Sequence, residues 1–156
     1  MTQVFVDMDG VLADFDRHHE AIFGVRPDKV ADNVNWGAVR AHKDYYLHIP
    51  PMADAFVLWD FVARLVKPPI VLTGIPSSVE EAAANKTAWV RKHLGEGVRV
   101  ICCPSKDKSL HAAPGDILID DWPKYRDAWL AKGGRWITHT SAERSIDELL
   151  EMGIGL

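Results

Sequence analysis

Little in this sequence points to an exported or membrane-spanning protein. The chain of 156 residues contains only two cysteines, the adjacent Cys102 and Cys103. Neighbouring residues of a strand point to opposite faces, so a disulfide between the two would be strained and a shared metal site awkward. No apolar stretch approaches the ~18 residues of a membrane span, and the N-terminus lacks the basic-then-apolar layout of a signal peptide. We therefore expect a cytoplasmic protein that has no membrane partner and keeps reduced thiols on a core strand.

The sequence also lacks an excess of positive charge. The formal net charge is -4 and the pI is near 5.9, whereas nucleic-acid binders usually show a basic patch or stripe. A nucleic-acid polymer is therefore not an expected partner, although a few local cations can still hold a small anion. The length suits one domain with a sizeable core.

Short β-branched runs bounded by turn residues recur along the chain. Apolar runs that do not alternate with polar residues suit strands buried on both faces of a parallel sheet. Stretches typical of helices lie between the later runs, at Ser78–Leu94 and Pro123–Ala131. Alternation of this kind predicts an α/β fold with a Rossmann-like parallel sheet flanked by helices. The predicted strands are Val4–Val6, Ile70–Leu72, Val98–Ile101, Ile117–Ile119 and Arg135–Thr138.

No strand is predicted between the first run and the second. We interpret residues 15–61 as a small, mainly helical cap inserted into a core formed by residues 1–14 and 62–156. The cap contains a helix-like stretch at Arg17–Phe23, in which His18 and His19 are interpreted as surface histidines.

Charged and polar residues follow each of the first four predicted strands. In an open parallel sheet such residues share the edge formed by the carboxyl ends of the strands, where ligands bind. Four aspartates at one edge suit Mg²⁺, which prefers oxygen ligands. With Mg²⁺ and lysine present, a phosphate can be held where a carboxylate attacks it to form an aspartyl-phosphate. The residues are Asp7 and Asp9; Thr73 and Gly74; Ser105, Lys106 and Lys108; and Asp120 and Asp121.

Each of these motifs has a plainer interpretation by itself. Asp7 to Gly10 can be a turn at the end of a strand, and Asp120-Asp121 can cap a helix before Pro123. The lysines of the later helix, Lys86 among them, usually belong to a solvated face. It is the order of the motifs on successive strand ends that favours a functional site.

The same residues resemble a known family. The stretch DMDGVLADF, followed by VLTG, a downstream lysine and LIDD, is similar to the four-motif signature of the haloacid dehalogenase (HAD) superfamily of phosphatases. More narrowly, DMDGVLADF, NKTAWVRKHLG and SKDK resemble the 5'(3')-deoxyribonucleotidase family. The likeness spans essentially the whole core, whereas the cap matches poorly and is short.

The resemblance implies an Mg²⁺-dependent phosphatase with a carboxylate nucleophile. Asp7 would attack and bind the metal, and Asp9 would bind it through the backbone carbonyl while its side chain acts as general acid and then base. Asp121 would ligate Mg²⁺ directly, and Asp120 either directly or through another ligand. Lys108 fits the catalytic lysine. Phosphate and substrate contacts would come from Thr73, the Gly74 amide, Lys86 and Lys106.

Two positions depart from the family pattern. The family has a serine where Gly74 stands, which removes one side-chain contact to phosphate. It stays open whether Lys106 replaces a cation of different geometry, since a lysine does not reproduce the fork of an arginine.

The substrate is expected to be a small phosphorylated metabolite, with a nucleoside monophosphate favoured over a sugar phosphate. Phe15 follows the first motif and can line the pocket. Trp36, Tyr45 and Tyr46 either stack a base or form the core of the cap.

Two alternatives of other classes stay open, a phospho-accepting signalling module and a non-catalytic binding protein. A homodimer is also left open.

Overall fold

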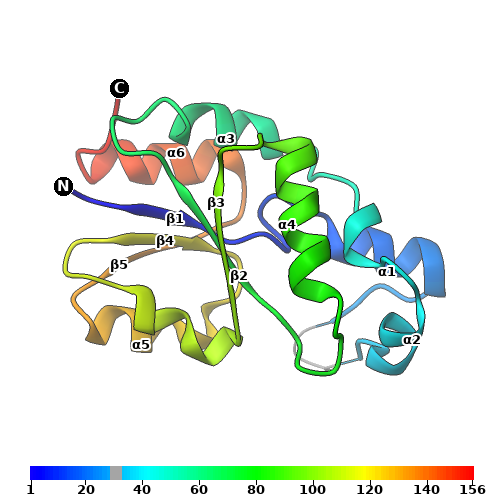
Figure 1. Ribbon diagram of the computed structural model, residues 1–156. Helices are drawn as coiled ribbons and strands as arrows, with labels where there is room; N and C mark the ends of the chain where they lie inside the picture. The colour runs from blue at the N-terminus through cyan, green and yellow to red at the C-terminus, as the bar shows by residue number, and fades with distance from the viewer. Residues whose placement is uncertain (29–32) are drawn as a thin grey trace.

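A five-stranded parallel sheet forms the centre of the molecule (Figure 1), with the strand order β3-β2-β1-β4-β5. The computed structural model describes residues 1–28 and 33–156; residues 29–32, part of the predicted cap, lie outside the described residues. All four strand pairs are parallel, which confirms the predicted α/β fold. The strands are β1 (Val4–Val6), β2 (Ile70–Gly74), β3 (Arg99–Cys103), β4 (Ile117–Asp120) and β5 (Arg135–Thr138).

Alternate residues of the strands enter two separate apolar cores. Val6 belongs to the core that includes residues of α3 (Ala55–Val62), α4 (Ala82–His93) and α6 (Ala142–Glu151). Phe5 points the other way, where its ring packs edge-on against Trp129 of α5 (Arg126–Ala131), with centroids 5.5 Å apart. Burial on both faces explains why the strands read as continuous apolar runs.

The later helices begin differently from their predictions. The predicted helix Ser78–Leu94 is shorter at its start, because residues 76–82 form two turns before α4, closed by Val79 N to Pro76 O and Ala82 N to Val79 O. The predicted helix Pro123–Ala131 divides into a 3₁₀ helix, η3 (Pro123–Tyr125), and α5. A further 3₁₀ helix, η2 (Ser105–His111), follows β3 directly.

The chain leaves the sheet after β1 and returns at residues 50–51, next to the point where it left. The inserted segment contains α1 (Phe15–Phe23), α2 (Trp36–Ala41) and the 3₁₀ helix η1 (Tyr46–His48). Ala13 forms a β-bridge with Pro51, and the Asp14 amide donates to the Pro50 carbonyl at 2.8 Å. The two ends of the insertion are therefore held together at one place on the sheet.

The helix α3 lies inside the range predicted as a cap, but it packs with the core. Leu58, Trp59 and Val62 are buried in the same apolar core as Val6, and α3 runs beside α6 in Figure 1. The division at residue 61 stays a prediction. From here on, we call residues 14–51, the segment closed by the contacts at Pro50 and Pro51, the insertion.

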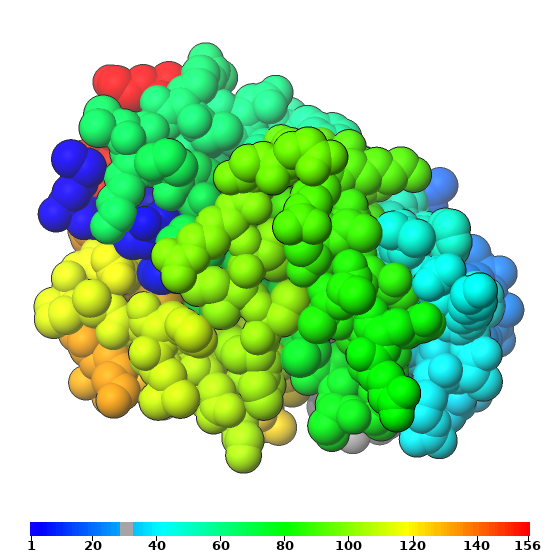
Figure 2. All heavy atoms as spheres, in the orientation of Figure 1, coloured from blue at the N-terminus to red at the C-terminus, as the bar shows by residue number. Residues whose placement is uncertain are grey.

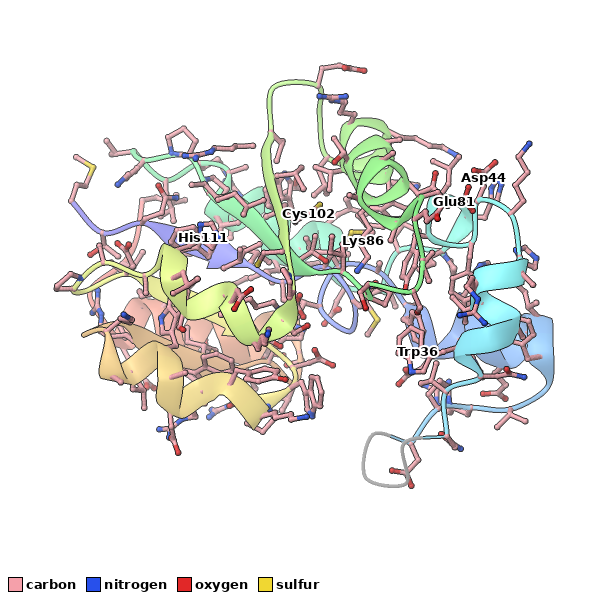
Figure 3. All side chains as sticks on the ribbon, turned by 60° about the horizontal axis from the view of Figure 1, so that its bottom comes forward. Trp36, Asp44, Glu81, Lys86, Cys102 and His111 are labelled. Atoms are coloured by element: carbon pink, nitrogen blue, oxygen red, sulfur yellow. The ribbon has the colours of Figure 1, made fainter. Side chains whose placement is uncertain are left out.

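The insertion lies against α4 rather than over the rest of the sheet. In Figure 2, α4 (green) separates the insertion (blue and cyan) from the segment after β3 (yellow-green). The Asp44 amide donates to Glu81 Oε1 at 2.6 Å, and these residues lie side by side in Figure 3. The Trp89 indole N–H donates to the Ile49 carbonyl at 2.7 Å. These bonds fix the insertion to the helix that carries Lys86.

The prediction that His18 and His19 lie on the surface is wrong. Both are buried, His18 with its ring 4.7 Å from that of Tyr45 and His19 with its ring 4.9 Å from that of Phe23. Aromatic rings pack against both histidines, and the two ring nitrogens of His19 also contact the Val25 carbonyl and the Asn35 amide. The polarity of the residues did not indicate this burial. Among the described residues, no helix has both the length and the apolar character needed to cross a membrane.

Candidate active site

Three carboxylates meet at the carboxyl edge of the sheet, as the strand ends predict. Asp7 follows β1, Asp120 ends β4, and Asp121 comes next in the chain. One oxygen of each lies within 4.8 Å of the others. Asp7 and Asp120 are buried, so the charges are concentrated where water screens them little.

Lys108 lies between two of these carboxylates. Its Nζ is 2.9 Å from Asp7 Oδ1 and 2.9 Å from Asp120 Oδ2. Lys108 is buried in η2, directly after β3, so a strand two places away from β1 supplies the cation for the Asp7 carboxylate. The parallel sheet thus gathers at one point residues that are 101 positions apart in the chain.

Burial and the neighbouring charges shift the pKa values of Lys108 and Asp120. Burial alone would lower the pKa of Lys108, but Asp7 and Asp120 outweigh it and the pKa is raised, which keeps the ammonium charged. Burial and then the Asp7 charge raise the pKa of Asp120 to about 6, against the lowering effects of Lys108 and of the Trp122 amide that donates to Asp120 Oδ1.

Gly10 makes room for Asp121. A Cβ at position 10 would lie 2.0 Å from Asp121 Oδ2, and Gly10 has a φ of +81° that other residues rarely adopt. The glycine of the DMDG stretch is therefore required both by the turn and by the approach of the carboxylate. The sequence indicated the turn but not this contact.

Asp9 is held by a buried lysine from α4. Lys86 Nζ lies 2.8 Å from Asp9 Oδ2, 3.1 Å from Thr73 Oγ1 and 2.6 Å from the Gly74 carbonyl oxygen. The same ammonium lies 4.6 Å from the centre of the Tyr46 ring. Lys86 is fully buried, so it does not belong to a solvated face. It joins β1, β2 and the insertion.

A cavity of about 270 Å³ opens between these charged groups and the insertion. Its charged end contains Asp7, Asp9, Lys86 and Lys108. In Figure 3, Lys86 and Trp36 approach it from different elements, α4 and α2. Gly74, Ser105, Asp120 and Asp121 also line the cavity. The rest of the wall contains one further acid and is otherwise apolar or aromatic: Asp16, Phe15, Pro27, Val34, Trp36, Tyr46, Ile75, Pro76, Trp122 and Tyr125. The site therefore combines an ionic end with an aromatic one.

The structure gathers most of the residues expected at the site from the sequence. Asp7, Asp9, Phe15, Gly74, Lys86, Lys108, Asp120 and Asp121 line the cavity, and Thr73 contacts Lys86. Lys106 does not line it and is exposed. Tyr45 is buried among rings of the insertion and does not line the cavity either.

Sequence reasoning missed several residues and contacts of the cavity. Trp122 and Tyr125 line the cavity just after the acidic pair, and their place beyond a strand end was the available signal. The contact of Tyr46 with Lys86 had no sequence signal. Ser105 was placed at the edge of the sheet without a function, and it also lines the cavity.

The residues present fit a divalent cation. Carboxylate oxygens are the ligands that Mg²⁺ prefers, and three of them converge at Asp7, Asp120 and Asp121. Asp7 and Asp120 share the Lys108 ammonium, so these two buried carboxylates keep a net negative charge that is costly in a buried place and that a cation would offset. Ligation by the Asp9 carbonyl stays a prediction.

Comparison with known proteins gives a fold but no close relative. No family model matches the sequence, and no curated protein matches it either. Among solved structures, the chain is similar to a HAD family hydrolase from Deinococcus radiodurans R1 that was solved with bound phosphate and sodium. The TM-score is 0.56 and the identity 12%, and the match covers 99% of this chain and 97% of that chain.

Two other similar structures are more distant. An L-2-haloacid dehalogenase from Xanthobacter autotrophicus has a TM-score of 0.49 and 14% identity, covering 97% of this chain and 83% of that one. A HAD hydrolase, family IA, variant 3, from Entamoeba histolytica HM-1:IMSS has a TM-score of 0.45 and 13% identity, covering 97% and 89%. None of the three is described as a deoxyribonucleotidase, so that resemblance stays a prediction. The chain has the fold of the HAD family hydrolases.

Proposed function

We propose that this protein is an Mg²⁺-dependent phosphatase that forms an aspartyl-phosphate on Asp7. The observation that carries the proposal is the convergence of the Asp7, Asp120 and Asp121 carboxylates within 4.8 Å, with Lys108 Nζ between the first two. A carboxylate is a nucleophile toward phosphoryl groups, and its charge must be balanced before a phosphate dianion can approach.

Asp7 and Lys108 act as a pair in the first step. Lys108 donates to Asp7 Oδ1 and fixes the orientation of the carboxylate. The carboxylate attacks phosphorus, a bond from the Asp7 oxygen to phosphorus forms, and the bond from phosphorus to the leaving oxygen breaks. Because its pKa is raised, Lys108 remains charged and offsets the negative charge that the phosphoryl group brings.

Asp9 supplies the proton that the leaving oxygen needs. Lys86 holds Asp9 through Oδ2, whereas the buried Oδ1 atom has no hydrogen-bond partner within residues 1–28 and 33–156. The side chain of Asp9 is 29% exposed and lines the cavity, so its carboxyl group can carry the proton to the leaving group and later take a proton from the water that hydrolyses the aspartyl-phosphate. Lys86 in this account is a positioning residue.

Asp7, Asp120 and Asp121 would hold the Mg²⁺. When bound, the ion polarises the phosphoryl oxygens and offsets the charge of the carboxylates around them. Gly10 keeps the Asp121 carboxylate in reach of the other two.

The wall of the cavity favours a substrate with a flat, aromatic leaving group. Aromatic side chains stack on single bases, and Phe15, Trp36 and Tyr46 line the cavity on the side of the insertion. We therefore propose a nucleoside monophosphate as the substrate, in keeping with the resemblance to the 5'(3')-deoxyribonucleotidases. A sugar phosphate would leave these rings without a matching surface.

A phosphate-release assay tests both parts of the proposal. The wild-type protein is incubated with nucleoside monophosphates, sugar phosphates and p-nitrophenyl phosphate, with Mg²⁺ or with EDTA. We expect release that requires Mg²⁺ and is fastest with nucleotides. Asp7→Asn should release no phosphate while retaining the circular dichroism spectrum of the wild type.

Two outcomes would contradict the proposal. Full activity of Asp7→Asn would exclude Asp7 as the nucleophile, and no release from any substrate would exclude a phosphatase. Faster release from sugar phosphates than from nucleotides would keep the chemistry and overturn the substrate class.

A further inference from the structure

The absence of a side chain at Gly74 is explained by a neighbour, not by the backbone. Gly74 ends β2 and is not among the glycines with a positive φ, so the backbone accepts other residues there. A Cβ at position 74 would lie 2.0 Å from Ser105 Oγ and 3.1 Å from Ser105 Cβ. The hydroxyl of Ser105 thus occupies the space that a side chain on β2 would fill.

This hydroxyl comes from a different strand end. Ser105 is the first residue of η2, which follows β3, and β3 is the direct neighbour of β2 in the sheet. Ser105 and Gly74 both line the cavity. Neighbouring strand ends are close enough for a residue after one of them to place its hydroxyl in front of the other.

The Ser105 hydroxyl can donate a hydrogen bond to a ligand at the charged end of the cavity. Among the residues that the structure describes, none receives a hydrogen bond from it, whereas Lys108, three residues later in the same η2, is engaged by Asp7 and Asp120. Any phosphoryl group placed for attack by Asp7 enters this end of the cavity. Its oxygens are acceptors, and the hydroxyl is a neutral donor that adds no charge to be balanced.

We propose that Ser105 binds a phosphoryl oxygen of the substrate, and that Gly74 is glycine so that this hydroxyl can reach the oxygen. The proposal rests on the phosphatase function proposed above and adds a phosphate-binding residue to it. It also accounts for the missing side-chain contact at position 74: the donor is present, but β3 and η2 supply it.

Direct binding of inorganic phosphate in the presence of Mg²⁺, measured by titration calorimetry, tests the proposal without depending on turnover. Ser105→Ala should weaken phosphate binding by about tenfold, the usual effect of losing one hydrogen bond to a charged group. Ser109→Ala removes a hydroxyl from the same 3₁₀ helix, but from a residue that does not line the cavity, and should bind phosphate as the wild type does.

A reciprocal exchange makes the test specific to the space shared by the two residues. Gly74→Ser alone should lower the melting temperature and weaken phosphate binding, because its side chain meets the Ser105 hydroxyl. Ser105→Gly alone should bind phosphate as weakly as Ser105→Ala. In the double variant, the atom of residue 105 that remains near the Cβ of the new side chain at position 74 is its Cα, at 3.4 Å. The double variant should therefore regain most of the lost phosphate affinity.

The outcomes separate this inference from the proposed function. If the wild type releases phosphate while Ser105→Ala binds phosphate as tightly as the wild type, the role of Ser105 is refuted and the phosphatase stands. A double variant that binds no better than Ser105→Gly refutes the exchange of positions. If the wild type neither binds nor releases phosphate, the proposed function falls and this inference falls with it.

Discussion

The carboxyl edge of the sheet and the insertion lie on different sides of the cavity, and different forces organise each of them. At the edge, Lys108 is 2.9 Å from two carboxylates and Lys86 is 2.8 Å from a third. In the insertion, rings pack on rings: Phe15 lies within 6.1 Å of the rings of Trp36, Tyr45 and Tyr46. Charge organises the first region and apolar contact the second.

The two regions should contact different parts of the substrate of the proposed enzyme. The ionic edge contacts the phosphoryl group, which all phosphomonoesters share, so changes there should lower kcat for every substrate. The aromatic side of the cavity contacts the leaving group, so changes there should raise KM for some substrates and not for others. Lys86 connects the regions, since its ammonium bonds Asp9 and also lies over the Tyr46 ring.

After Asp7→Asn, the largest effect on the ionic edge should come from Lys108→Met. Methionine retains an apolar stem of similar length but leaves Asp7 and Asp120 without their shared cation. We expect kcat to fall by about 100- to 1000-fold for nucleotides and for p-nitrophenyl phosphate alike. Steady-state kinetics with both substrates measures this, and Lys132→Met, on an exposed lysine after α5, is the control. A loss of kcat for only one of the substrates would contradict the assignment of the ionic edge to the phosphoryl group.

The next effect concerns the metal. In Gly10→Ala the new Cβ would displace the Asp121 carboxylate, and we expect the Mg²⁺ concentration for half-maximal activity to rise by at least about tenfold. Gly24→Ala is a matched control, because Gly24 has a φ of +75° but nothing within 4 Å of the added Cβ. Both variants should lose about 1–2 kcal/mol of unfolding free energy from backbone strain. An equal Mg²⁺ requirement in both would show that Asp121 does not bind the ion.

A selective effect is expected in the insertion. Trp36 is 39% exposed and lines the cavity, so Trp36→Ala should raise KM for nucleotides by about tenfold and leave KM for a small sugar phosphate unchanged. Phe56→Ala removes an aromatic side chain of similar exposure, 43%, that does not line the cavity. Equal changes for both substrates would mean that the ring does not contact the leaving group.

The smallest effect is on stability. Burial lowers the pKa of His18 below its usual value of 6.5, with smaller lowering contributions from His42, His48 and His19 and a raising one from the Tyr45 backbone. As the pH falls through 6.5, the unfolded chain takes up a proton that the folded chain refuses. The free energy of unfolding should therefore decrease, by at most about 1.4 kcal/mol per pH unit for one histidine.

His18→Gln tests this through urea unfolding between pH 8 and pH 5. The variant should lose less stability than the wild type over this range, whatever the difference between the two at pH 8, which reports packing alone. The remaining slope should combine the effects of His93 and His139, whose pKa values burial also lowers, with an opposite contribution from Asp120, whose pKa is raised to about 6. An identical slope in variant and wild type would contradict the assignment.

The sequence predicted the ionic edge better than the insertion, and the physics of each explains why. Buried parallel strands give continuous apolar runs, so β1 was predicted at its observed bounds and the acids at the strand ends were placed together. Asp7 and Lys108 are far apart in the chain, but the topology alone brings them to one edge.

The insertion could not be predicted in the same way. Its side chains are positioned by ring packing, which leaves no periodic signal, so the burial of His18 and His19 was missed. The helix α3 reads AFVLWDFV, which is too apolar all round to show which layer it joins. Periodicity did carry a signal for Lys86, which lies three and four positions before the buried Trp89 and Val90 on the same face of α4, whereas Lys92 lies on an exposed face. The signal was missed because lysine is usually solvated.

The most direct test of the account is to capture the phosphorylated aspartate. The wild-type protein is mixed with a nucleoside monophosphate and Mg²⁺, quenched in acid within one turnover, digested and analysed by mass spectrometry. We predict that the peptide containing Asp7 gains the mass of one phosphoryl group, and that this gain is absent from Asp7→Asn. Phosphate release in the wild type with no phosphoryl group on that peptide, or with the group on another residue, would contradict the assignment of Asp7 as the attacking group.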